Sequence, residues 1–190
     1  MSDATDHKIV LIVRPTRLDD LVARFNTVQQ AQFYVEHLGA DFSDYLAEHR
    51  RYREAATAAE TVLRGLGLVQ RLERRFLPNF VFGAEDSIVV LGQDGLVANT
   101  LKYLDGQRVV GVNPDPGRWD GVLLPFTVED LPRIMPEELQ RKRPVRTVTM
   151  AKATLNTRQT LYAVNDLFIG QRSHVSARYK IAIGDRAEQQ

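Results

Sequence analysis

Short apolar runs recur along the first part of the chain and are separated by longer, more polar segments. Their lengths, and the β-branched residues within them, are typical of strands buried on both faces of a parallel sheet. The runs lie at residues 8–13, 87–91 and 108–112, with a weaker one at 68–72. We therefore predict four strands, the first of which is closed by Pro15, because proline cannot donate to a central ladder.

Helical patterns fill the segments between those runs. Apolar residues recur at helical spacing over residues 19–38, 41–66 and 96–104. Thr127 and Asp130 have the spacing of a capping box, which predicts the start of a short helix. Strands and helices thus alternate, and this alternation predicts an α/β fold built on a parallel sheet.

The pattern changes after residue 144. Candidate strands then follow one another without a helix between them, at residues 145–149, 159–169 and 175–183. We therefore expect an α/β domain over residues 1–144 and the start of an antiparallel β domain over residues 145–190. The basic cluster at residues 141–146 falls at this boundary and indicates a solvated linker rather than a nucleic-acid site.

Composition excludes several classes of protein. A hydrophobic content of 44% can fill a core, and 25 basic residues balance 24 acidic ones, which argues against a nucleic-acid partner. The chain has no cysteine, and its four histidines lack the spacing of a metal site, so we expect no metal site built by the protein. Without a signal-peptide pattern or a bilayer-length apolar run, we expect a cytoplasmic protein that does not contact membranes.

The segment that follows residues 87–91 carries the candidate chemistry. It reads Gly92-Gln93-Asp94-Gly95 and leads into a predicted helix, whose N-terminus attracts anions. Glycine lets the backbone approach a phosphate, whereas Asp94 would repel one. The aspartate therefore indicates a general base for a nearby hydroxyl or a ligand for Mg²⁺. Taken alone, an ordinary turn before a helix explains this tetrapeptide better.

Several motifs in this order resemble the NAD kinase family. They are the Gly-x-Asp-Gly turn, the Gly111-Val112-Asn113 segment and the Val164-Asn165-Asp166-Leu167 segment. Arg14-Pro15-Thr16-Arg17 is similar to the mitochondrial-type branch of that family, as is the Pro114-Asp115-Pro116-Gly117-Arg118 segment. The resemblance covers nearly the whole chain, and the first two motifs are separated as in a single β-α-β unit.

The resemblance implies a phosphotransferase. Enzymes of this family move the γ-phosphate of ATP, with a divalent cation such as Mg²⁺, to the 2′-hydroxyl of the adenosine ribose of NAD, and so make NADP. Asp94 matches the aspartate that takes the hydroxyl proton, and Gly92 and Gly95 match the glycines that face phosphate. Asn165 and Asp166 match the pair that holds the dinucleotide. Family members are commonly oligomeric, so a homo-oligomer is expected as well.

Two arginines are further candidates for the binding site. Arg14 and Arg17 come directly after the first predicted strand, where ligands bind in parallel sheets. Both could neutralise the phosphates of a nucleotide. The alternative is that both are ordinary solvated arginines, and the sequence does not decide between the two interpretations.

The chain also departs from the family pattern. Gln93 stands where the family has glycine, and Leu96 stands where it commonly has threonine. The Gly-, Ser- and Thr-rich segment that completes the nucleotide pocket in the family has no counterpart before Gln190. We therefore expect a relative that is truncated at its C-terminus.

Three functions follow from these observations. The first is an NAD kinase, and the second is a kinase of a related lipid or sugar hydroxyl, since such enzymes carry similar loops. The third is a truncated, catalytically weak or inactive homologue that binds nucleotide or pairs with other subunits. Asn165 and Asp166 favour the first over the second.

Overall fold

The chain forms two compact units, Met1–Thr149 and Met150–Gln190, in a computed structural model. The structure describes residues 7–164, 167–168 and 180–189. Residues 144–149 have no regular secondary structure, so the boundary expected near residue 144 falls in an irregular stretch that ends where the second unit begins.

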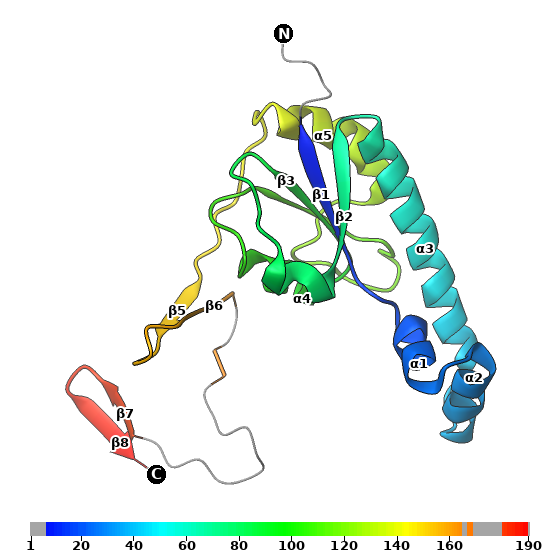
Figure 1. The fold of residues 1–190 in the computed structure, drawn as a ribbon, viewed down its shortest axis with the longest axis horizontal. Helices are drawn as coiled ribbons and strands as arrows, with labels where there is room; N and C mark the ends of the chain where they lie inside the picture. Colours follow the sequence, from blue (N-terminus) through cyan, green and yellow to red (C-terminus); the bar gives the residue numbers. More distant parts are fainter. Residues whose placement is uncertain (1–6, 165–166, 169–179, 190) are drawn as a thin grey trace. The chain divides into compact units, whose positions relative to one another are not determined.

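The first unit is built around a sheet of four parallel strands (Figure 1). Their order across the sheet is β2-β1-β3-β4. The strands are β1 Lys8–Val13, β2 Leu68–Glu73, β3 Ser87–Leu91 and β4 Val109–Val112. All four predicted strands are confirmed, and the antiparallel strand pairs of the second unit complete the predicted α/β class.

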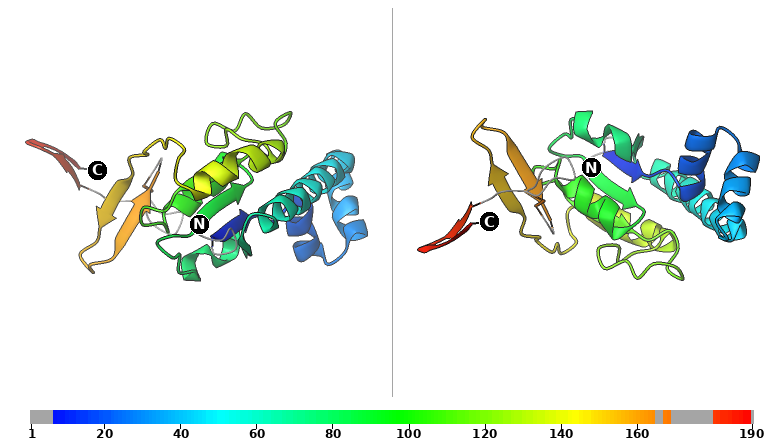
Figure 2. Two further views of the ribbon diagram at one scale, coloured as in Figure 1. Left: turned by 90° about the horizontal axis from the view of Figure 1, so that it is seen from above. Right: turned by 90° about the horizontal axis from the view of Figure 1, so that it is seen from below.

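Helices cover both faces of this sheet. The helices of the first unit are α1 Arg17–Phe25, α2 Val28–His37, α3 Phe42–Arg64, α4 Asp94–Leu101 and α5 Leu131–Leu139, with 3-10 turns η1 Arg74–Asn79 and η2 Val128–Asp130. The capping box predicted at Thr127 and Asp130 is present at the start of η2, which continues into α5. The parallel sheet lies between α5 on one side and η1 on the other (Figure 2).

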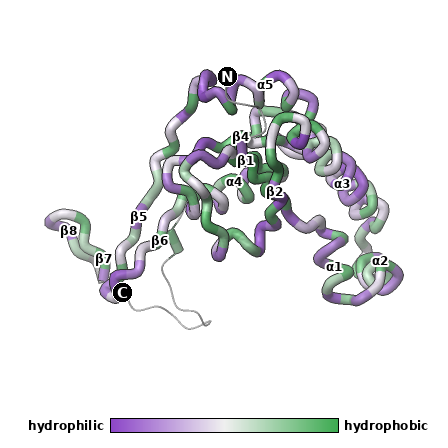
Figure 3. Tube along the Cα trace, turned by 45° about the horizontal axis from the view of Figure 1, so that its top comes forward, coloured by the Kyte–Doolittle hydropathy of each residue, from purple (hydrophilic) through white to green (hydrophobic). Residues whose placement is uncertain are grey.

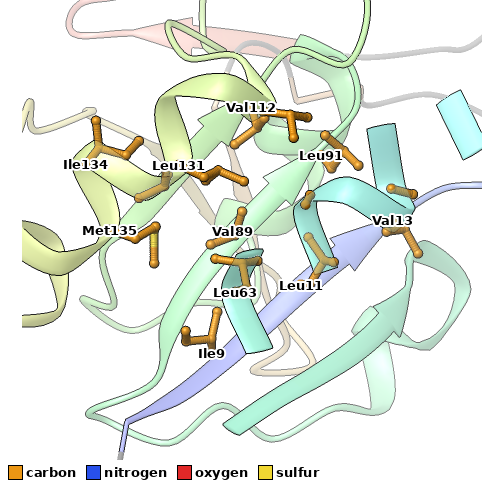
Figure 4. Close-up of a cluster of buried hydrophobic side chains, with 14 of the residues drawn as sticks. Ile9, Leu11, Val13, Leu63, Val89, Leu91, Val112, Leu131, Ile134 and Met135 are labelled. Carbon is orange, nitrogen blue, oxygen red and sulfur yellow. The ribbon is translucent and has the colours of Figure 1, made fainter. Parts of the chain in front are cut away.

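Alternation along each buried strand divides its side chains between two cores. Ile9 and Leu11 of β1 face the C-terminal half of α3 and the helix α5, where they meet Leu63 and Leu131 (Figure 4). Val10 and Ile12 face the other way and pack with α4 and η1. Strands buried on both faces explain why these runs are continuously apolar rather than alternating, and hydrophobic residues gather in the strands of this sheet (Figure 3).

The helical character predicted over residues 19–38 is confirmed, and the structure divides this stretch into two helices, α1 and α2. Asn26 ends α1 in the left-handed conformation with φ of 68°, and asparagine tolerates this region better than most residues. Thr27 then caps α2 by accepting from the backbone N–H of Gln30. The two helices lie at the N-terminal end of α3, away from the sheet (Figure 1).

The described residues of the second unit form two antiparallel hairpins, β5–β6 and β7–β8. Its strands are β5 Ala151–Thr154, β6 Thr160–Ala163, β7 Lys180–Ile183 and β8 Arg186–Gln189. The strand predicted at residues 145–149 is wrong, because these residues are irregular and no strand among the described residues pairs with them. The strand predicted at 159–169 is reduced to β6 in its described part, and residues 175–179 of the last predicted strand lie outside the described residues.

Candidate functional site

The order of the sheet defines one position suited to a ligand. The chain leaves β1 for β2 on one side and later returns to the other side of β1 to form β3. Ligands of open parallel sheets bind at such a switch point, beyond the carboxyl ends of the two strands. Here those ends continue into Arg14 and Gly92, so the residues that the sequence singled out meet at this position.

The turn over residues 92–95 joins β3 to α4. Gly92 is buried and donates its N–H to the carbonyl of Val112 at 3.2 Å, whereas Gly95 is exposed. A Cβ atom at Gly92 would lie 2.8 Å from Cδ2 of Leu96 and 3.8 Å from Cδ of Arg14. The packing of Leu96 beside Arg14 therefore leaves no room for a side chain at Gly92. Of the two glycines of this turn, Gly95 is the one with open space beside its backbone for a ligand.

Asp94 is the first residue of α4 and is half-buried. Its Oδ1 accepts the backbone N–H of Leu123 at 2.7 Å, and its Oδ2 accepts that of Val122 at 3.2 Å. These donors belong to the 113–127 loop, which follows β4. The carboxylate thus fastens this loop to the start of α4 by hydrogen bonds to the backbone, without forming an ion pair in the described part of the chain.

The Gly111-Val112-Asn113 segment shapes the same loop. A Cβ atom at Gly111 would lie 2.1 Å from the carbonyl oxygen of Leu123, so the loop crosses directly over this glycine. The buried side chain of Asn113 donates to the carbonyl of Trp119 at 2.8 Å and accepts the N–H of Asp115 at 3.0 Å. The role of Asn113 in the described structure is therefore to hold the loop.

Arg14 and Arg17 both bind Glu48 on α3. The distances are 2.9 Å from the Nη2 atom of Arg14 and 2.5 Å from the Nε atom of Arg17. Glu48 is only 3% exposed, so its charge is neutralised by two cations in a buried position. The two arginines are thus paired in this structure rather than solvated separately, and a phosphate would have to compete with Glu48 for them.

One donor of Arg14 stays unused among the described residues. Its Nε atom is buried and has no hydrogen-bond partner, although Nη1 and Nη2 are bonded to Pro15 and Glu48. Buried donors without a partner are rare in folded proteins. This atom belongs to the side chain that lies beside Gly92, and because it is buried, an acceptor at the switch point reaches it only after the arginine side chain moves.

Tyr52 of α3 connects the two strand ends at the switch point. Its hydroxyl accepts the N–H of Arg14 at 2.9 Å and donates to the carbonyl of Leu91 at 3.0 Å. Burial raises the pKa of Tyr52. The sequence-based reasoning missed both Tyr52 and Glu48; the available signal was a pair of polar residues four apart on the face of α3 that packs inward.

A second group of ions joins α3 to the 113–127 loop. The hydrogen bonds of Arg118 and Arg17 to Asp44 lower the pKa of that carboxyl to about 2. Arg51 pairs with Asp115 at 3.2 Å, close to the loop turn that Asn113 holds.

Glu48 has a lowered pKa although it is buried. Burial raises the pKa of this carboxyl, but the hydrogen bonds from Arg17 and Arg14 lower it by more, so the net pKa is lowered. The site is thus rich in both signs of charge.

The remaining predicted residues and groups have the following positions. Asn165 and Asp166 lie outside the described residues, so the structure does not test their role. Within residues 7–164, 167–168 and 180–189, no three histidines, aspartates or glutamates gather in a group that could hold a metal ion. In the same residues, no helix is long and apolar enough to cross a membrane.

No protein-family model matches the chain, and no curated protein matches its sequence.

Proposed function

We propose that this chain is an NAD kinase-like phosphotransferase, which transfers the γ-phosphate of ATP to the 2′-hydroxyl of the adenosine ribose of NAD. One observation carries the proposal: the turn that contains Asp94 lies at the switch point of a parallel sheet, next to Arg14. An aspartate in a position suited to phosphate is costly unless it performs a task there. Proton transfer from a hydroxyl beside the phosphate is such a task.

The proposed reaction assigns a part to each residue. Asp94 takes the proton of the ribose hydroxyl as that oxygen attacks the γ-phosphorus, and the bond from this phosphorus to the bridging oxygen breaks, so that ADP leaves. An ionised carboxylate has about four acceptor positions. The loop amides use one on each oxygen, and the others are available to the substrate.

Phosphate binding is assigned to the start of α4 and to Arg14. The exposed backbone at Gly95 and the positive end of the helix dipole favour an anion. Once the side chain of Arg14 moves toward the ligand, its unused Nε donor adds a charge-assisted hydrogen bond. Because the described residues hold no cluster of metal ligands, Mg²⁺ is assigned to the substrate, MgATP, where phosphate oxygens and water supply most of its ligands.

A second candidate is a chain that binds nucleotide without catalysis. The observation that favours it is the pairing of the site's charges with one another: Arg14 and Arg17 with Glu48, and Asp94 with the loop amides. A site in which the charges are satisfied internally has less to gain from a substrate. Nucleotide would then bind weakly, and Asp94 would act on the fold alone.

The deciding experiment measures NADP formation by the purified 190-residue chain with NAD, ATP and Mg²⁺. The kinase proposal expects activity that Asp94→Asn abolishes and that Asp120→Ala, an exposed acid of the same loop, leaves intact. Calorimetric titration of each variant with MgATP and with NAD separates the candidates. Binding without turnover supports the second candidate, and absence of both binding and turnover contradicts both.

A further inference from the structure

Five charged residues form a continuous row of ion pairs that begins at the switch point. Each contacts the next in the order Arg14, Glu48, Arg17, Asp44 and Arg118. The three arginines come from the end of β1, the start of α1 and the 113–127 loop, whereas both carboxylates come from α3. The row therefore holds one more positive than negative charge, and its first member lies beside Gly92.

The two ends of this row differ in their access to solvent. The side chains of Arg14 and Glu48 are 12% and 4% exposed. Those of Arg118, Arg17 and Asp44 are 22%, 39% and 44% exposed. A ligand from solvent therefore reaches the outer three residues, while the buried Glu48 keeps Arg17 in place. Of the two carboxylates, Asp44 is the one that a ligand can displace.

Aromatic rings orient both exposed arginines. The guanidinium carbon of Arg17 lies 4.3 Å from the centroid of the Tyr45 ring. That of Arg118 lies 5.9 Å from the centroid of the Trp119 ring. Contacts of this kind attract a guanidinium to the face of the ring and restrict its orientation. Two guanidinium groups that are held in advance lose less conformational entropy when they bind a ligand.

Asp44 binds these two arginines as an anionic ligand would. Its Oδ2 accepts from Nη2 of Arg17 at 2.7 Å, and its Oδ1 accepts from Nη2 of Arg118. Two oxygens of a phosphate group can replace this pattern, with one oxygen on each arginine. Ion pairs that are partly exposed add little to stability, so the loss of Asp44 from the arginines costs little. A phosphate group brings more negative charge than a carboxylate and therefore competes well with Asp44.

We propose that Arg17 and Arg118 form a phosphate-binding site and that Asp44 occupies this site in the free protein. The inference rests on the proposed function for the source of the phosphate, which is then a phosphate group of ATP or of NAD. It adds Arg118 to the binding residues and gives Asp44 the role of an internal competitor. The 113–127 loop thereby contacts the ligand through Arg118, while Asp94 holds the same loop at Val122 and Leu123.

Calorimetric titration of the full chain with inorganic pyrophosphate tests the site. Asp44→Asn removes the competing charge and should tighten binding by about threefold or more. Arg118→Gln removes a charge-assisted donor and should weaken binding by about tenfold. The matched controls, Glu54→Gln and Arg50→Gln, make the same charge changes at exposed positions of α3 outside the row and should leave the affinity unchanged.

Two results overturn the proposal. One is an affinity that does not rise in Asp44→Asn or does not fall in Arg118→Gln. The other is the absence of pyrophosphate binding in both wild type and Asp44→Asn. Circular dichroism checks that each variant is folded, and unchanged hydrogen exchange at the amide of Leu123 checks that Asp94 still holds the loop in Arg118→Gln.

Titrations with MgATP and with NAD identify the source of the phosphate. A loss of affinity in Arg118→Gln that is confined to MgATP assigns the phosphate to ATP, and a loss confined to NAD assigns it to NAD. NADP formation then separates this inference from the proposed function. An active wild type whose affinities for both nucleotides are independent of Arg118 keeps the proposed function and overturns the phosphate site. An inactive wild type whose pyrophosphate affinity depends on Arg118 and Asp44 as expected keeps the site and contradicts the proposed function.

Discussion

Asp94 has a structural task whether or not it has a catalytic one. Its carboxylate accepts the N–H groups of Val122 and Leu123, so the loop that follows β4 depends on it. We expect Asp94→Ala to lower the free energy of unfolding by about 1–2 kcal/mol, because the partly buried N–H of Leu123 and the exposed N–H of Val122 lose their acceptor. Hydrogen exchange at the amide of Leu123 should become faster. Unchanged exchange in the variant would contradict this account of the contact.

This expectation also affects how an inactive variant is understood. An Asp94→Ala protein that has lost its loop could be inactive for a structural reason alone. Asp94→Asn keeps an acceptor oxygen for one loop amide and removes the base, so it is the sharper test of catalysis. Asp120→Ala, which changes an exposed acid of the same loop, should leave both the exchange of Leu123 and the stability unchanged.

Two glycines of the site should respond in opposite ways to alanine. At Gly111 a methyl group would lie 2.1 Å from the carbonyl oxygen of Leu123, so Gly111→Ala should destabilise the fold by about 2 kcal/mol or more. At Gly95 a methyl group meets no atom within 4 Å, and alanine favours a helix, so stability should rise by about 0.5–1 kcal/mol. Urea unfolding measures both changes, and an equal loss at the two positions would contradict the prediction.

Gly95→Ala also serves as a probe of ligand binding. Because the fold does not require glycine there, a loss of MgATP affinity in this stable variant would come from the added methyl group at the binding surface. Unchanged affinity would place the phosphates elsewhere. Gly111→Ala thus tests whether the fold requires a glycine, whereas Gly95→Ala tests whether ligand binding requires one.

Glu48 should make stability depend on pH in the acidic range. Its pKa is lowered in the folded state, so its contribution is fully present above its ordinary pKa of 4.5 and is lost as pH falls through the folded value. We expect Glu48→Gln to be less stable than wild type at pH 7 and to lose less stability on acidification. Urea unfolding at pH 7, 5, 4 and 3 tests this, and parallel pH profiles of the two proteins would contradict it.

At the scale of secondary-structure elements, the sequence predicts those elements whose determining residues lie close together along the chain. Three strands of the parallel sheet are buried on both faces and are therefore continuous apolar runs that are easy to locate. The edge strand β2 is mostly exposed, which explains its weaker signal. Thr127 and Asp130 form their capping box within four residues, so their spacing was sufficient.

The sequence predicts less well the strands and helix ends that depend on tertiary contacts or on the conformation of a single residue. Residues 145–149 have a strand-like pattern, but a strand needs a partner, and no segment in the described part of the chain pairs with them. The strand β8 contains neither β-branched nor aromatic residues and forms because Gly184, with φ of 57°, turns the chain back along β7. The break between α1 and α2 depends on the conformation of one residue, Asn26.

The candidate site was predictable in part for the same reason. The turn of residues 92–95 follows its strand directly in the sequence, so its position at the carboxyl end of the parallel strands could be inferred. The partners of its residues come from distant segments: Glu48 from α3 for the arginines, and the amides of Val122 and Leu123 for Asp94. Pairings over such separations leave no regular spacing in a single sequence.

At the scale of the whole molecule, the two units differ in how much they bury. The first unit has two apolar cores against the sheet and a third beneath the α1–α2 hairpin. In the described part of the second unit, Ala163 is the buried hydrophobic residue, whereas Leu161 and Ile183 are half or more exposed. Two-stranded hairpins without a core are marginally stable in water, so the first unit should hold most of the stability.

Limited proteolysis with trypsin should therefore divide the chain between the units. Lys142 and Arg146 are exposed in an irregular stretch, and Lys152 and Arg158 are exposed beyond it. We expect a resistant fragment that ends near residue 146, identified by mass, while cleavage inside α3 is slow because that helix packs on the sheet. A fragment of residues 1–149 made separately should unfold cooperatively at nearly the melting temperature of the whole chain. Early cleavage within the parallel sheet, or an unfolded fragment, would instead mean that the first unit depends on the second.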